Sequence, residues 1–182
     1  MKSIKVKKMV MVAVFAAISF ALQMIAPFPK VGGFLEIEFS DLPALIIAFA
    51  YGPVSGILVE LFKNLLHCTV TSTGFVGEFA NFVVNGIFVA VAGLIYMNHK
   101  TFKRAIVSLV AATLCLAGAG ILVNMYIMLP LYMPDAPMSV VMPIVLGTIL
   151  PFNIVKGIVT SVITMLIYKR ISPIIKFSGG QK

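Results

Sequence analysis

The sequence predicts an all-α integral membrane protein, and its composition and the distribution of its apolar residues point to this fold class. Of the 182 residues, 60% are hydrophobic and 11% are charged, whereas a soluble domain carries about 25% charged residues. The apolar residues form long runs, and no stretch between them is long and polar enough for a soluble domain. Residues 1–182 are therefore expected to form a single transmembrane domain.

The basic residues, which give the chain a net charge of +8, lie beside the apolar runs. They gather at residues 2–8, at residues 100–104 and in the tail from residue 169 onward. Basic clusters at the ends of membrane spans are typical of cytoplasmic segments. The charge therefore indicates membrane topology, and we expect no binding to nucleic acid.

Motifs for catalysis, nucleotide hydrolysis and metal binding are missing from the sequence. No Gly-rich loop ends in Gly-Lys-Ser/Thr, so the chain is not expected to hydrolyse ATP through a P-loop. Cys68 and Cys115 have no metal-ligand spacing and are interpreted as small packing residues. We find no Ser-His-Asp set and no converging acids, and therefore expect neither catalytic residues nor a metal site.

The apolar run at residues 9–26 follows a basic segment and at first resembles a secretory signal peptide. It is long and has no clear small-x-small cleavage site, so we expect a retained helix that ends at the Pro-Phe-Pro of residues 27–29. Ala13, Ala17 and Ala21 recur every four residues, and small residues at this spacing let another helix approach closely. The stripe predicts a docking face, although ordinary helix propensity also produces such stripes.

The segment 30–40 is expected to be an outer loop. Apolar and acidic residues alternate in it, beginning with Phe34, Leu35 and Glu36. A segment of this kind can lie extended over a pocket or serve as an interfacial connector. Asp41 follows the loop and is expected to cap the next helix.

The stretch 41–66 is long enough to cross a bilayer as one helix, but charge distribution favours two. A single helix would give five spans and place the second and third basic clusters outside. A break at Gly52-Pro53 gives short helices at residues 42–51 and 54–66, and six spans in total. We therefore predict six transmembrane helices with cytoplasmic N- and C-termini.

The last apolar run contains a single charge. Two further helices are expected at residues 75–97 and 102–129, followed by an outer loop at residues 130–143 and a last helix within the apolar run that extends from residue 140 to residue 168. Lys156 is the only charged residue of the last run, and a charge within the bilayer costs about 3 kcal/mol or more. It must therefore face a partner or a wet cavity, and Asn153, three residues earlier, shares its helix face.

The predicted topology places the intramembrane polar residues in one layer of the outer half. These residues are Lys63, Asn64, Glu78, Asn81, Asn85, Asn124, Asn153 and Lys156. Each alone is more often a packing residue satisfied by a neighbouring helix, but their common depth indicates a pocket open to the outside. Its amides, cations and apolar surroundings suit a flat apolar ligand with hydrogen-bonding edges.

Several blocks of the sequence resemble the riboflavin-binding S components of energy-coupling factor (ECF) transporters. They are Ala-x-x-x-Ala from Ala13, Glu36-Ile37-Glu38-Phe39-Ser40-Asp41-Leu42-Pro43, Gly52-Pro53-Val54-x-Gly56, Lys63-Asn64-Leu65-Leu66, Gly77-x-Phe79-Ala80-Asn81-Phe82, Leu129-Pro130-Leu131-Tyr132 and Pro151-Phe152-Asn153-x-x-Lys156-Gly157. The blocks span nearly the whole chain, and the Gly77 and Pro151 blocks are the most specific.

The resemblance implies a substrate-binding subunit with the S-component fold in a bacterial cell membrane. Such a subunit captures riboflavin from outside and docks onto a transmembrane T component with two ATPases. The residues matching Asn124, Asn153 and Lys156 contact the vitamin, and the loop with Phe34, Leu35 and Glu36 covers it. The alanine face meets the T component. Riboflavin is the transported ligand, and no cofactor is expected.

Other interpretations remain open from the sequence. The chain could be an S component for another vitamin, a small membrane enzyme or a channel. An enzyme acting on lipid would need acids or histidines clustered at the cytoplasmic face, and a channel would need polar faces through the whole membrane. Lys156 could serve the ligand or pair with Glu60 or Glu78, and Glu60 could instead pair with Lys63 at three-residue spacing.

Overall fold

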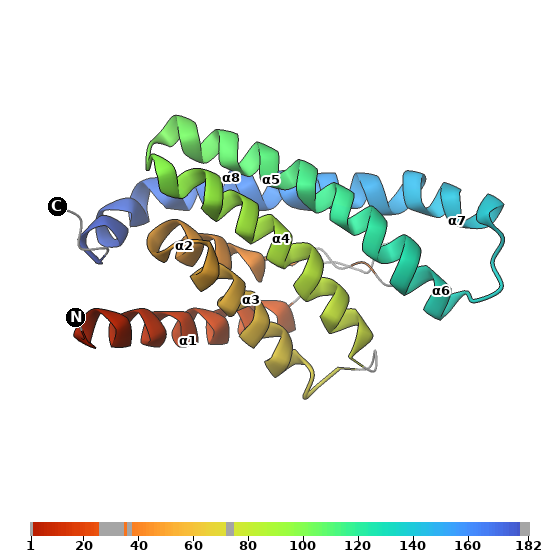
Figure 1. The fold of residues 1–182 in the computed structure, drawn as a ribbon, viewed down its shortest axis with the longest axis horizontal. Helices are drawn as coiled ribbons and strands as arrows, with labels where there is room; N and C mark the ends of the chain where they lie inside the picture. The colour runs from red at the N-terminus through yellow and green to blue at the C-terminus, as the bar shows by residue number, and fades with distance from the viewer. Residues whose placement is uncertain (1, 26–34, 36–37, 72–74, 179–182) are drawn as a thin grey trace.

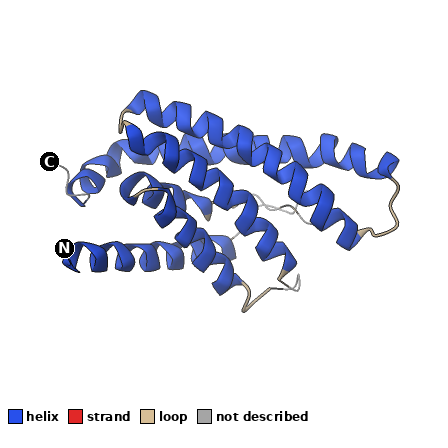
Figure 2. Cartoon of the chain, viewed as in Figure 1, coloured by secondary structure: helices blue, strands red, loops and turns tan. Residues whose placement is uncertain are grey.

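The structure, a computed structural model, describes residues 2–25, 35, 38–71 and 75–178. In these residues the regular elements are helices packed into one bundle (Figure 1, Figure 2). They are α1 (Lys2–Met24), α2 (Asp41–Tyr51), α3 (Pro53–His67), α4 (Val76–Asn98), α5 (Phe102–Val123) with its continuation α6 (Leu129–Tyr132), α7 (Met138–Ile144) and its continuation α8 (Leu150–Ser178). The predicted all-α class is confirmed for this part of the chain.

Four helical stretches of the described chain are long and apolar enough to cross a membrane. They are Lys5–Met24, Val76–Asn98, Phe102–Tyr132 and Met138–Ile167. The elements α2 and α3 have 11 and 15 residues, which is short for a span of about 20 residues. The protein is therefore a multi-helix membrane protein in which α2 and α3 form a shorter pair.

The predicted break between α2 and α3 is confirmed at Gly52-Pro53. Gly52 has φ 93°, a left-handed conformation that costs glycine little because it has no Cβ. Pro53 then starts α3, where its missing N–H is not needed. The chain reverses here, so α2 and α3 pack side by side in opposite directions (Figure 1).

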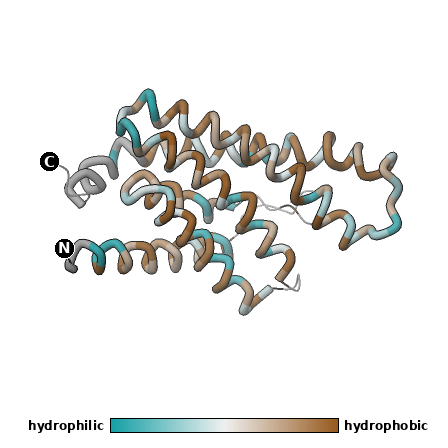
Figure 3. Tube along the Cα trace, in the orientation of Figure 1, coloured by the Kyte–Doolittle hydropathy of each residue, from teal (hydrophilic) through white to brown (hydrophobic). Residues whose placement is uncertain are grey.

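The connections alternate between the two ends of the bundle. Figure 1 shows the start of α1, the α2–α3 turn, the α4–α5 connection and the end of α8 at one end. The loops that follow α3 and α6 lie at the opposite end. In Figure 3 the α4–α5 connection and the start of α1 are hydrophilic, while the helices between the ends are mainly hydrophobic.

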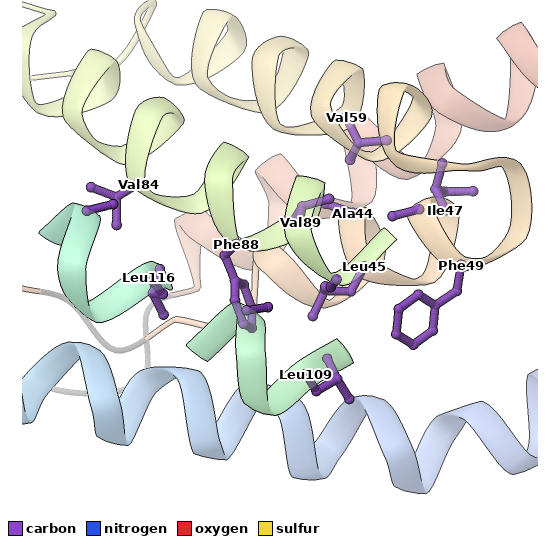
Figure 4. Packing of buried hydrophobic residues seen from close by; sticks show 14 of the residues in the cluster. Ala44, Leu45, Ile47, Phe49, Val59, Val84, Phe88, Val89, Leu109 and Leu116 are labelled. Carbon is purple, nitrogen blue, oxygen red and sulfur yellow. The ribbon is translucent and has the colours of Figure 1, made fainter. Parts of the chain in front are cut away.

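The apolar core joins α2, α4 and α5, with contributions from α1 and α3. Leu45, Phe88 and Leu109 meet near its centre (Figure 4). Small residues allow the helices to approach: a Cβ on Gly93 would lie 2.9 Å from the Cα of Pro53. The core therefore anchors the short α2–α3 pair against the long helix α4.

The helix that was predicted to end before Pro130 continues past this proline. The helix does not end before Pro130 but continues to Tyr132 through a π-helical turn at Asn124–Met128. A second π-helical turn, Val145–Ile149, precedes Pro151. Proline cannot donate to the carbonyl four residues earlier, and its ring crowds that carbonyl, so a wider turn before it lets the helix continue. The predicted loop shrinks accordingly to residues 133–137.

The first helix presents its predicted alanine stripe to the outside of the bundle. Ala13, Ala17 and Ala21 are exposed, whereas Val12 and Ala16 are buried against the core. The described helix ends at Met24, slightly before the predicted end at residue 26, and the Pro-Phe-Pro segment lies outside the described residues. The stripe thus faces away from the apolar core formed by the described residues.

Candidate functional site

Asp41 stands at the centre of a buried ionic cluster at one end of α2. Its Oδ1 lies 2.9 Å from the Nζ of Lys63, and its Oδ2 lies 3.0 Å from the Nζ of Lys156. Asp41 and Lys63 are fully buried and Lys156 is 6% exposed. The expected cap role of Asp41 is wrong: Ser40 occupies the N-cap without a side-chain cap bond, and Asp41 is the first helical residue. One carboxylate therefore joins α3 to α8.

Lys63 uses its three donors within the protein. Besides Asp41, its ammonium lies 2.6 Å from Oε2 of Glu60 and donates a 3.1 Å hydrogen bond to Oγ of Ser40. The predicted pairing of Glu60 with Lys63 is confirmed. Whether Lys63 also contacts a ligand stays a prediction.

Lys156 belongs to a ring of polar side chains that reaches α4. It donates to Oδ1 of Asn85 at 3.3 Å, and Asn85 donates to Oδ1 of Asn81 at 3.0 Å. Asn81 donates to Oε1 of Glu38 at 3.1 Å. That same Glu38 oxygen lies 3.7 Å from Nζ of Lys156, which closes the ring. The structure thus brings together three of the predicted site residues, Asn81, Asn85 and Lys156.

The cluster has more carboxylates than ammonium groups among the described residues. Glu38, Asp41 and Glu60 face Lys63 and Lys156. Among the described residues, Oε2 of Glu38 and Oε1 of Glu60 are buried without a hydrogen-bond partner, whereas buried acceptors are normally paired.

Asn124 and Asn153, the other predicted contact residues, converge on Gly120 of α5. Asn124 donates from Nδ2 to the carbonyl of Gly120 at 2.8 Å. The amide of Asn153 packs on the same glycine, where a Cβ would lie 2.5 Å from Nδ2, and it donates to the carbonyl of Ile149 at 2.9 Å. Both asparagines are buried. Asn124 is the first residue of one π-helical turn and Asn153 donates to the last residue of the other, and such turns occur frequently at functional sites.

An apolar cavity opens at the loop end of α6 and α7, and neither asparagine is part of its lining. Its volume is about 190 Å³, and its lining residues are Met125, Tyr126, Pro130, Met133, Pro134, Ala136, Met138 and Val141. Leu35 from the predicted covering segment is half-buried and packs against Leu129, Val145 and Ile149 nearby.

Glu78, another predicted site residue, pairs with a histidine of α3. It accepts from or donates to His67 Nδ1 at 2.8 Å, depending on the protonation of the pair, so His67 connects α3 to α4. Phe34 and Glu36 lie outside the described residues. Their contacts with a ligand stay predictions.

Sequence reasoning missed Asp41 and Glu38 as site residues. Two lysines within predicted membrane helices need acidic partners, and Glu38 and Asp41 are acids close to the start of α2. This need for acidic partners was the signal available in the sequence, but Asp41 was interpreted as the cap of its own helix.

Comparison with known proteins identifies the family of this chain. The family model described as "ECF transporter, substrate-specific component" matches residues 7–168. The chain belongs to this family. A solved S component, described in "Structure and mechanism of the S component of a bacterial ECF transporter", superposes with a TM-score of 0.81 at 38% identity, over 94% of this chain and 99% of that one.

Curated relatives of this S component are riboflavin transporters. The riboflavin transporter RibU of Staphylococcus aureus (strain TCH60) is 37% identical over 176 residues, which cover 93% of each chain. The riboflavin transporter FmnP of Bacillus subtilis (strain 168) is 34% identical over 178 residues, which cover 93% of this chain and 94% of that protein. Both relatives are named as transporters.

Proposed function

We propose that this S component is the substrate-capture subunit of a riboflavin uptake transporter in the cell membrane. The observation that carries the proposal is the near full-length similarity to two riboflavin transporters. The burial of three polar side chains, Asn124, Asn153 and Lys156, within the helices supports it. Residues 1–182 act together as one substrate-binding domain.

The ligand site is assigned to the face where α5 and α8 meet. Isoalloxazine is flat and largely apolar, with polar atoms along one edge, so amides and an ammonium among methionines and aliphatic residues match both parts. Asn124, Asn153 and Lys156 bind the polar edge in this proposal. Leu35, with Phe34 and Glu36, covers the ligand from the outer side, and Glu78, Asn81, Asn85 and Lys63 complete the polar surroundings.

The transport role assigned to the chain requires partners. The sequence has no P-loop of its own, so an ECF transmembrane T component and two ATPase subunits supply the energy. Small exposed residues let another helix approach closely, and Ala13, Ala17 and Ala21 provide such a surface on α1. Docking therefore takes place on α1, away from the ligand site.

The proposed topology has six spans with both termini in the cytoplasm. The alternating connections in Figure 1 and the basic residues near the start of α1 and in the α4–α5 connection support it. The short helices α2 and α3 each cross part of the bilayer, which leaves the polar segment before α2 below the surface. Such a segment is tolerated where it lines a cavity.

An S component for another vitamin is the alternative, and the two relatives do not favour it. The colour of the purified protein provides a simple first test, since a bound flavin makes it yellow. Quenching of flavin fluorescence then measures riboflavin affinity, with thiamine and biotin as competitors. We expect saturable riboflavin binding that neither competitor displaces; binding displaced equally well by another vitamin would contradict the proposal.

A further inference from the structure

We propose that Asp41 is a positioning residue for ligand binding, which holds the ammonium of Lys156 in place and joins it to Lys63. The inference rests on the proposed function, because it takes Lys156 as a ligand contact. Asp41 itself is not assigned a contact with the ligand. Among the described ion pairs, no other carboxylate is paired with both lysines.

The geometry of Asp41 allows little movement. Each of its oxygens meets a different ammonium, at 2.9 Å for Lys63 and 3.0 Å for Lys156. Ser40 lies on the same side, with its Oγ 3.4 Å from Oδ1. The residue starts α2, which is packed into the core through Leu45 and Ile47. A short side chain on an anchored helix therefore fixes the position of the carboxylate.

Lys156 depends on this carboxylate for its position. A lysine ammonium is a point charge on a flexible four-carbon stem, and its described partners besides Asp41 are weaker. Asn85 is a neutral acceptor at 3.3 Å, and Glu38 lies at 3.7 Å, beyond ordinary hydrogen-bond distance. Without the Asp41 charge, the ammonium is drawn toward Glu38. With the Asp41 charge in place, one N–H of the Lys156 ammonium remains to reach a ligand.

Glu60 offers a matched comparison for Asp41. Both are buried carboxylates paired with Lys63, and both become neutral amides of the same shape in Asp41→Asn and Glu60→Gln. Of these two carboxylates, only Asp41 is also paired with Lys156 among the described residues. If loss of a buried charge alone lowers riboflavin affinity, both variants bind more weakly. If Asp41 positions Lys156, only Asp41→Asn binds more weakly.

The first experiment is a double-mutant cycle on riboflavin affinity in purified protein. We expect Asp41→Asn to weaken binding about tenfold and Glu60→Gln less than about threefold, because only the first frees Lys156. In a Lys156→Met background, Asp41→Asn should have no further effect on affinity. Equal losses in the two single variants, or an undiminished loss in the Lys156→Met background, would overturn the proposal.

The second experiment follows the Lys156 ammonium itself, without ligand. In protein labelled with nitrogen-15 lysine, its signal is identified by its absence from Lys156→Met. We expect the signal to shift or disappear in Asp41→Asn and to persist in Glu60→Gln. An unchanged signal in Asp41→Asn would contradict the positioning role. Failure of the wild type to bind riboflavin would instead contradict the proposed function, and the ammonium signal would still decide the role of Asp41.

A further variant keeps the test valid if Asp41→Asn does not fold. Asp41→Asn combined with Lys63→Met and Glu60→Gln neutralises all three ions that meet at Lys63, so it leaves none of them stranded. Lys156 again lacks its main partner, and we expect the same loss of affinity and the same change in its signal. Wild-type affinity and an unchanged signal in this variant would refute the proposal.

Discussion

The Cα of Gly120 packs directly against the side-chain amide of Asn153, and there is no room between them for a methyl group. A Cβ at residue 120 would lie 2.5 Å from Nδ2 and 2.7 Å from Cγ of Asn153. Gly120 also supplies the carbonyl that accepts from Asn124. One glycine of α5 thus sets the positions of both asparagines.

Gly120→Ala is therefore expected to displace the amide of Asn153 and to weaken riboflavin binding by about tenfold, the equivalent of 1.4 kcal/mol. The matched control is Gly118→Ala on the same helix, since a Cβ there meets nothing within 4 Å. Titration of both variants by flavin fluorescence measures the difference. Equal affinities for the two would show that the packing at Gly120 does not support the ligand site.

Lys156→Met is expected to lower both riboflavin affinity and thermal stability. The change removes a ligand contact, which lowers affinity. It also takes one cationic partner from Asp41 and Glu38, and breaking a buried ion pair lowers the free energy of unfolding by about 3 kcal/mol. Adding Asp41→Asn should restore part of the stability and none of the affinity. Thermal unfolding and binding are measured on the same samples; recovery of affinity together with stability would make Lys156 purely structural.

Much of the fold was predictable because its signals are local. Gly52 needs a left-handed backbone and Pro53 fits a first helical turn, so the α2–α3 break was visible in adjacent residues. The basic clusters and the apolar runs between them predicted the positions of the long helices. Continuation past Pro130 was not predictable in this way, because proline usually stops a helix and a π-helical turn has no comparable sequence signal.

The candidate site was only partly predictable, because its contacts connect distant residues. Asn85 and Lys156 were assigned to one layer by helix direction and depth, and the structure joins them. The contact between Asp41 and Lys156 joins two residues far apart in the sequence, and nothing in the local sequence around Asp41 distinguishes a carboxylate that pairs with a lysine from one that caps its own helix.

Ala17→Trp is expected to block riboflavin uptake in cells while leaving binding to the purified protein unchanged. Ala17 is exposed on α1, where a large side chain prevents close approach of a partner helix. Leu114→Trp on α5 is the control, because Leu114 is a 68% exposed apolar residue elsewhere on the surface. Loss of binding in folded Ala17→Trp, or equal loss of uptake in Leu114→Trp, would contradict a docking face on α1.

The six-span topology predicts opposite sides for two connections. In a protein whose Cys68 and Cys115 are replaced, Thr101→Cys should be protected from an impermeant thiol reagent added outside intact cells. Asp135→Cys, in the loop between α6 and α7, should react. Both should react after the membrane is permeabilised. Labelling at position 101 from the outside would overturn the topology.

The central claim is that this S component binds riboflavin through polar side chains where α5 and α8 meet, and Asn153 tests it most directly. Asn153→Leu removes the amide and keeps a side chain of similar size, which leaves polar atoms of the ligand unpaired at about 1–3 kcal/mol. Equilibrium titration of the purified wild type and variant should show saturable riboflavin binding that is about tenfold to a hundredfold weaker in Asn153→Leu. Equal affinity in a folded variant would contradict the account.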